Sequence, residues 1–168
     1  DAVDENDEDC DLHTLMRVYS QMGGLYQRVA AFENERIADS NAERLAWQIG
    51  DTISALRLMW AQACCLYDSR NQSQAIMILD SIAQFTEKNG IQEDPDLIYP
   101  IKTDYYLERK DIKCAEILLR EYENKTGILT ESLDTLNYDM AHFYLKGKYY
   151  NIAYKPDSAI QMFNKLLH

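Results

Sequence analysis

Valine, glycine and proline are scarce in this chain of 168 residues. It contains three valines (Val3, Val18 and Val29), six glycines and three prolines. A β-sandwich or β-barrel needs more β-branched residues in its strands and more turn residues between them. The chain is 46% apolar and 27% charged, which is enough apolar material for a packed core. The composition therefore favours an all-α fold over an all-β one.

Long apolar runs are also missing. No stretch of eighteen apolar residues occurs, so we expect no direct insertion of this segment into a membrane. No basic-then-apolar signal segment stands at the start of the sequence. The first residue is Asp1 instead of methionine, which predicts a processed chain or a piece cut out of a longer one.

Basic residues are outnumbered, with 17 Lys and Arg against 28 Asp and Glu and a net charge of −11. Residues 1–11 carry seven acidic residues and no basic one. We expect this N-terminal segment to be solvated and frayed, with binding to a basic partner as the alternative. The remainder, residues 12–168, is expected to form a single domain. It has no basic stripe, so a nucleic-acid partner is not expected.

Motifs for catalysis and for metal binding are missing as well. The four cysteines, Cys10, Cys64, Cys65 and Cys114, fit neither a zinc pattern nor a C-x-x-C redox pair, and we expect them to pack between helices. There is no phosphate-binding glycine loop and no G-x-S-x-G motif. We therefore expect no enzyme, no metal and no cofactor. A rival hypothesis, an enzyme with a pocket between helices, has Cys64 and His142 as its candidate nucleophile and base.

Apolar residues instead recur every three or four positions, as amphipathic helices require. Leu56, Trp60, Ala63 and Tyr67 are one such series. We predict eight helices, at about residues 12–29, 32–48, 52–69, 73–88, 96–109, 112–124, 132–154 and 156–167.

Residues that start and end helices agree with these ranges. Asp51 and Asp111 are suited to cap helix N-termini. Each helical stretch that precedes Gly50, Gly90 or Gly127 is expected to end there, because glycine accepts the left-handed conformation at a helix C-terminus. Pro95 and Pro100 are expected around the start of a helix, where a missing N–H costs little.

One spacing of small and large residues occurs three times. A small residue is followed by Leu or an aromatic residue three positions later, by alanine at twelve, and by large apolar residues at sixteen and nineteen. The copies are Ala63, Leu66, Ala75, Leu79 and Ile82; Thr103, Tyr106, Ala115, Leu119 and Tyr122; and Gly147, Tyr150, Ala159, Phe163 and Leu166. The alanines are 40 and 44 residues apart. This register predicts four antiparallel helix pairs, at about 12–48, 52–88, 96–124 and 132–167.

The first pair fits the register only in part. Gly23 and Ala42 agree with it, but Glu35 and Asp39 stand where an alanine and a large apolar residue belong. A terminal repeat can depart from the pattern because one of its faces meets water.

The inner spacing of the register resembles that of the tetratricopeptide repeat. The repeat is longer than the usual length of about 34 residues, and its length alone also allows a HEAT-like array. The resemblance implies a right-handed superhelical solenoid of about four antiparallel helix pairs.

Several segments are also similar to the tetratricopeptide regions of bacterial membrane-anchored signalling proteins. They are residues 19–35, 49–56, 115–129 and 144–168, and the K-P-D-S-A-x-x-x-F element at 155–163 is the most specific. In those proteins the region precedes a membrane segment and a histidine-kinase-like or DNA-binding output module. The resemblance implies a sensory or interaction region on the extracytoplasmic (periplasmic) side of a membrane. The residues themselves leave a cytoplasmic location open.

In a tetratricopeptide stack the first helices of the pairs line a concave face. In this register the candidate binding residues on that face are Arg17, Gln27, Arg57, Trp60, Tyr67, Asp104 and Lys148. Trp60 with Arg57 and Tyr67 has the composition of an interface hot spot. Core packing against the neighbouring pair is the alternative for Trp60.

We therefore expect a protein-interaction scaffold that binds a protein or peptide on its concave face. The alternative is a structural spacer that forms a homodimer. Its candidate self-association end is the last helix, through Ile160, Phe163 and Leu167, because an apolar end without a capping helix needs a further repeat or a partner.

Overall fold

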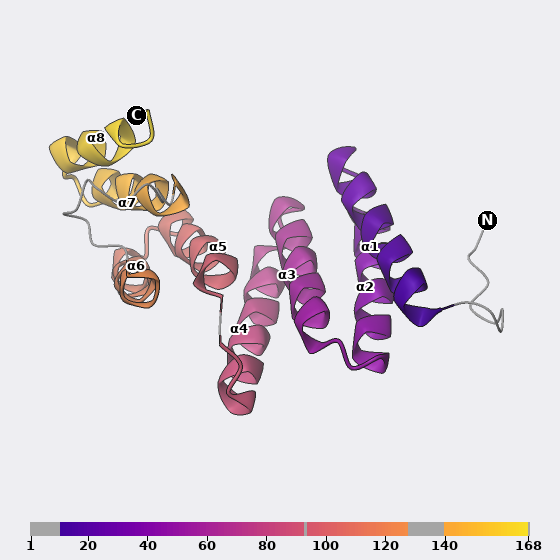
Figure 1. Cartoon of the computed structure of the whole chain (residues 1–168). Coiled ribbons are helices and arrows are strands. Elements are labelled where there is room, and N and C mark those ends of the chain that lie inside the picture. The colour runs from indigo at the N-terminus through magenta and orange to yellow at the C-terminus, as the bar shows by residue number, and fades with distance from the viewer. Residues whose placement is uncertain (1–10, 93, 128–139, 168) are drawn as a thin grey trace. The chain divides into compact units, whose positions relative to one another are not determined.

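The computed structural model describes residues 11–92, 94–127 and 140–167. These residues form eight α-helices, which confirms an all-α fold (Figure 1). The helices are α1 (Leu12–Arg28), α2 (Phe32–Gln48), α3 (Thr52–Asp68), α4 (Gln72–Asn89), α5 (Pro95–Glu108), α6 (Ile112–Thr126), α7 (Met140–Ile152) and α8 (Pro156–Asn164). Most bounds lie within two residues of the predicted ones. The predicted part of α7 at 132–139 lies outside the described residues, and α8 ends three residues early.

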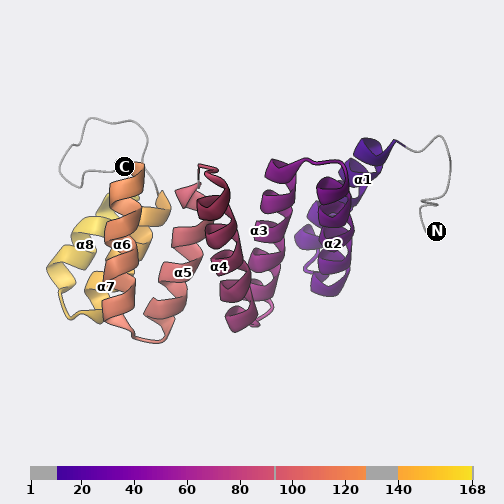
Figure 2. The same ribbon diagram turned by 90° about the horizontal axis from the view of Figure 1, so that it is seen from below.

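The chain divides into two compact units, Asp1–Gln92 and Glu93–His168, called unit 1 and unit 2 below. In unit 1, the four helices α1 to α4 lie side by side in chain order, each packed on the next (Figure 2). In unit 2, α5 packs on α6 and α7 on α8, and α7 also contacts both α5 and α6. The helices thus pack as the sequential pairs that the register predicts. The single domain predicted for residues 12–168 stays a prediction.

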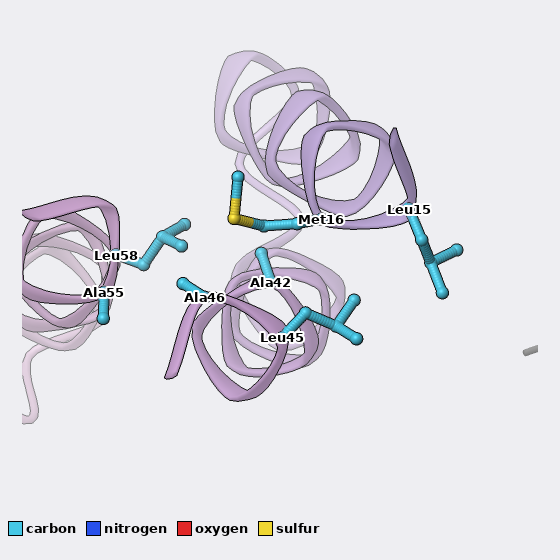
Figure 3. Packing of buried hydrophobic residues seen from close by; sticks show 7 residues of the cluster. All are labelled: Leu15, Met16, Ala42, Leu45, Ala46, Ala55 and Leu58. Carbon is cyan, nitrogen blue, oxygen red and sulfur yellow. The ribbon is translucent and has the colours of Figure 1, made fainter. Parts of the chain in front are cut away.

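One hydrophobic cluster of unit 1 lies where α1, α2 and α3 meet. Its buried residues are Leu15, Met16, Ala42, Leu45, Ala46, Ala55 and Leu58. Met16 lies over Ala42, and Leu58 points from α3 toward the contact between α1 and α2 (Figure 3). The alanines let the helix backbones approach closely, and each large side chain that is buried here contributes about 1.5–3 kcal/mol to folding. In unit 2 one cluster of buried residues contains Leu107, Ala115, Leu119 and Leu145.

The predicted helix caps are confirmed. The Asp51 carboxylate accepts a hydrogen bond from the Ser54 N–H at 3.0 Å, and Asp111 accepts one from the Cys114 N–H at 3.1 Å. Gly50, Gly90 and Gly127 have positive φ angles of 78°, 62° and 69°, as the left-handed end of a helix requires.

Proline positions follow the prediction at one of two places. Pro95 is the first residue of α5, where no N–H is needed. Pro100 lies inside α5 and not around its start. It removes the hydrogen bond that its position would donate to the carbonyl of residue 96, one turn earlier.

The turn within each pair repeats, and the sequence did not predict it. Ala30, Arg70, Lys110 and Tyr154 have positive φ angles of 53°, 66°, 57° and 56°, and they follow α1, α3, α5 and α7. In each case the next residue donates its N–H to a carbonyl five residues earlier, at 3.0, 2.7, 2.9 and 2.8 Å. The spacing of these turns, 40, 40 and 44 residues, equals that of the side-chain register. Two independent features, backbone and side chain, are therefore consistent with a helical repeat.

Candidate functional site

The small residue of the register opposes the residue that follows sixteen positions later. A Cβ atom added to Gly23 would lie 2.0 Å from Oδ1 of Asp39, and one added to Gly147 would lie 2.5 Å from Cε1 of Phe163. The equivalent residues of the middle pairs, such as Ala63 and Leu79, are fully buried. In the first and last pairs the first helix is therefore held against its second helix at the same register point, and burial of the equivalent residues in the middle pairs agrees with this.

On α3 the uncovered face carries Arg57, Trp60 and Tyr67, named here the α3 surface. Ala55 and Leu58, on the opposite side of the helix, are buried in the core of unit 1. Arg57 is exposed, while Trp60 and Tyr67 are half-buried. The indole Nε1 of Trp60 is buried without a hydrogen-bond partner among the described residues. Trp60 is thus partly packed and partly open, and its role in binding stays a prediction.

On α1 the predicted residues Arg17 and Gln27 are both exposed. Near the start of this helix, Asp51 caps α3. Hydrogen bonds from Ser54 lower the pKa of the Asp51 carboxyl most, and the charges of His13 on α1 and Arg57 on α3 lower it further.

In unit 2 the two predicted binding residues pair with each other. The Lys148 ammonium on α7 donates to Oδ1 of Asp104 on α5, and it also lies 5.4 Å from the centre of the Tyr144 ring. Burial opposes the charge of Lys148, but the hydrogen bond and the negative charge of Asp104 raise its pKa. A ligand at this place would meet an ion pair rather than two independent charges.

At the end of unit 2 the three predicted self-association residues differ. Ile160 and Leu167 are 56% and 78% exposed. Phe163 is half-buried, because its ring fills the space over Gly147 and lies 6.5 Å from the Tyr144 ring. Phe163 therefore belongs to the packing within the last pair, and two of the three residues remain exposed.

A polar cluster in unit 2 was missed by sequence reasoning. His142 is fully buried, and its Nε2 lies 2.9 Å from Oε1 of Glu123 on α6, which also accepts a hydrogen bond from Lys146. Burial would raise the pKa of Glu123, but the hydrogen bonds from Lys146 and His142 lower it. Nineteen residues separate Glu123 from His142, so no local motif could reveal the contact.

The thiols of unit 1 are poorly suited to nucleophilic chemistry. Burial, together with the charges of Asp68 and Glu35, raises the pKa of Cys64 to about 12. The pKa of the buried Cys65 is likewise raised to about 12, first by burial and then by Glu35. A thiol reacts as its thiolate, which is negligible at neutral pH for such groups.

No group of three or more His, Cys, Asp or Glu side chains that could hold a metal ion lies within the described ranges. None of the helices in those ranges is long and apolar enough to cross a membrane. Comparisons with protein-family models, with curated proteins and with solved structures give no match for this chain.

Proposed function

We propose that this chain is a protein-interaction scaffold of the tetratricopeptide type, in which the α3 surface of unit 1 binds a peptide or protein. The observation that carries the proposal is the row of Arg57, Trp60 and Tyr67 on the uncovered face of α3. Trp, Tyr and Arg dominate the binding energy of protein interfaces, above all where the aromatic ring is already partly desolvated. The half-buried Trp60 ring meets that condition.

The same proposal includes a superhelical arrangement of the pairs and a place in a bacterial signalling protein. Its support is the similarity of residues 115–129 and 144–168 to the tetratricopeptide regions of such proteins, together with the repeated turn and register. We propose a binding role without catalysis, supported by the high thiol pKa of Cys64.

The test is a peptide-library screen on the full chain, followed by titration of the selected peptide. Trp60→Phe is expected to weaken binding at least about tenfold, since a hot-spot residue contributes about 2 kcal/mol or more. The matched control is Trp47→Phe on α2, where Trp47 packs against Phe85 at 5.3 Å between ring centres. Equal affinities of both variants and the parent chain would contradict a binding role for the α3 surface.

A second candidate function is self-association through the end of α8, which the exposed Ile160 and Leu167 favour. Solution mass over a concentration series distinguishes it from the first. A dimer that dissociates when both residues become Asp would support the spacer function, with Asn164→Asp on the exposed part of the same helix as the control. A monomer at all concentrations would contradict it.

A further inference from the structure

Two carboxyl groups are buried one turn apart on α2. Glu35 is 2% exposed and Asp39 is 4% exposed. Oε2 of Glu35 is buried and has no hydrogen-bond partner among the described residues. In the register these positions correspond to Ala75 and Leu79 of the next pair, which are fully buried. Polar acids thus occupy two positions that pack apolar side chains elsewhere in the repeat.

The helix α1 supplies no compensating charge to this pair. The residue of α1 that meets Asp39 is Gly23, whose added Cβ would lie 2.0 Å from Oδ1 and 3.0 Å from Cγ of Asp39. The arginines of α1, Arg17 and Arg28, are exposed. Asp39 is therefore pressed against an uncharged backbone.

The groups that face the pair from α3 are thiols and an acid. The thiol of Cys65 interacts with Glu35, and the negative charge of Asp68 also acts on Glu35. Asp39 is influenced by the charge of Glu35 itself. Cys64 completes this group and feels the charges of both Asp68 and Glu35.

The remaining neighbours of α2 leave the pair uncompensated as well. Arg36, on α2 itself, pairs at 2.6 Å with Glu33 on the exposed side of the helix. The helix α4 meets α2 through the ring contact of Phe85 with Trp47, toward the other end of α2. The charges that act on the two carboxyl groups are therefore negative.

A buried carboxylate without a cation is unfavourable, and such a group binds a proton instead. Burial first, and then the charge of Glu35, raises the pKa of Asp39 from its ordinary value of 3.8 to about 6. Burial and Asp68 also raise the pKa of Glu35, against a smaller opposite effect of the Cys65 hydrogen bond.

We propose that Glu35 and Asp39 form a buried proton-binding site that controls the packing of α1 on α2, so that unit 1 closes when the site is protonated and loosens when it ionises. The geometry supports this directly, because Gly23 of α1 is the surface that Asp39 touches. Ionisation places a negative charge at that contact without a cation beside it, which opposes close packing of α1 on the pair. The inference does not depend on the proposed binding function.

The direction of the pH effect follows from the two protonation states. Between the ordinary and the folded pKa of Asp39, the folded chain binds more protons than the unfolded chain, so stability falls as the pH rises. The loss is complete above the folded value. With 3.8 and about 6 as the two values, the unfolding equilibrium constant of unit 1 is expected to rise about tenfold from about pH 5 to about pH 7.5.

The experiment is urea unfolding of the full chain at these two pH values, read by tryptophan fluorescence. The chain has two tryptophans, Trp47 and Trp60, and both lie in unit 1. The variants are Asp39→Asn and Glu35→Gln, and the control is Glu87→Gln. Glu87 is exposed on α4, and its substitution changes the net charge by the same amount.

We expect the parent chain and the Glu87→Gln control to show the tenfold change, and Asp39→Asn to show a change below about threefold. Glu35→Gln is expected to fall between them, because burial still raises the pKa of Asp39 when the charge of Glu35 is removed. An equal pH response in all four proteins would overturn the proposal, as would no response in the parent chain. If a cluster variant fails to fold, the proposal is tested by a carboxyl-carbon NMR titration of Asp39 in the parent chain. Titration well above 3.8 supports the site, and titration at that value overturns it.

Discussion

Replacing Gly23 by alanine is expected to lower the free energy of unfolding of unit 1 by about 2 kcal/mol, as overpacking of a core commonly does. The added Cβ would lie 2.0 Å from Oδ1 of Asp39, which is buried and has little room to move. The same substitution at the next residue, Gly24, is expected to raise the free energy of unfolding by up to about 1 kcal/mol. A Cβ on Gly24 would meet nothing within 4 Å, so only the better helix propensity of alanine remains.

Urea unfolding followed by tryptophan fluorescence checks both values, because the two tryptophans report on unit 1 alone. The neighbouring glycines share one helix and one chemical change, so each is the control for the other. Effects of the same sign at both positions would show that Gly23 does not meet Asp39. Asp39→Ala is expected to relieve most of the Gly23→Ala loss.

Replacing Gly147 by alanine is expected to lower the free energy of unfolding of unit 2 by about 2–3 kcal/mol. Three ring atoms of Phe163 would lie at 2.5, 2.7 and 2.8 Å from the added Cβ. An aromatic ring is rigid, and the whole ring of Phe163 must shift to accept the methyl group. The measurement is chemical unfolding by far-UV circular dichroism, with hydrogen exchange of α7 and α8 to assign the loss to the last pair.

A double-mutant cycle with Phe163→Leu isolates this contact. Leucine is smaller and flexible, so we expect it to lessen the Gly147→Ala loss by at least about 1 kcal/mol. Leu119 occupies the equivalent register position in the preceding pair, sixteen residues after Thr103. Additive effects of the two substitutions would mean that Gly147 and Phe163 are not in contact.

The sequence alone predicts the helices well, for physical reasons. Aspartates that accept hydrogen bonds from first-turn amides and glycines with positive φ mark helix ends locally, as Asp111 and Gly90 do. The register predicts pairing because a small residue is needed where two backbones approach. The contact of Gly147 with Phe163 is the direct consequence of that rule.

The turns within the pairs could not be predicted by the same means. They place Ala30, Arg70, Lys110 and Tyr154 in the left-handed region, although none of these residue types favours it. The packing of the flanking helices imposes the conformation. Only the recurrence of the positions at the register spacing could have indicated them.

The candidate site was predictable as a set of positions but not as a set of contacts. Asp104 and Lys148 were both expected on a binding face, and their ion pair joins residues 44 positions apart. Phe163 was expected at an exposed end. Its ring instead occupies the space beside Gly147, which is open because glycine has no side chain. Such outcomes depend on which helix lies opposite, which residue patterns along one helix do not specify.

The central claim is that residues sixteen positions apart lie opposite each other in every helix pair. Methyl NOE spectroscopy of the full chain tests this claim most directly. The two middle pairs carry methyl groups at both register positions, Ala63 with Leu79 and Thr103 with Leu119. We predict strong methyl cross-peaks within each of these two couples, at the point equivalent to the contact of Gly147 with Phe163. Cross-peaks from Ala63 or Thr103 to residues one turn away on the partner helix, without those to Leu79 and Leu119, would contradict the register.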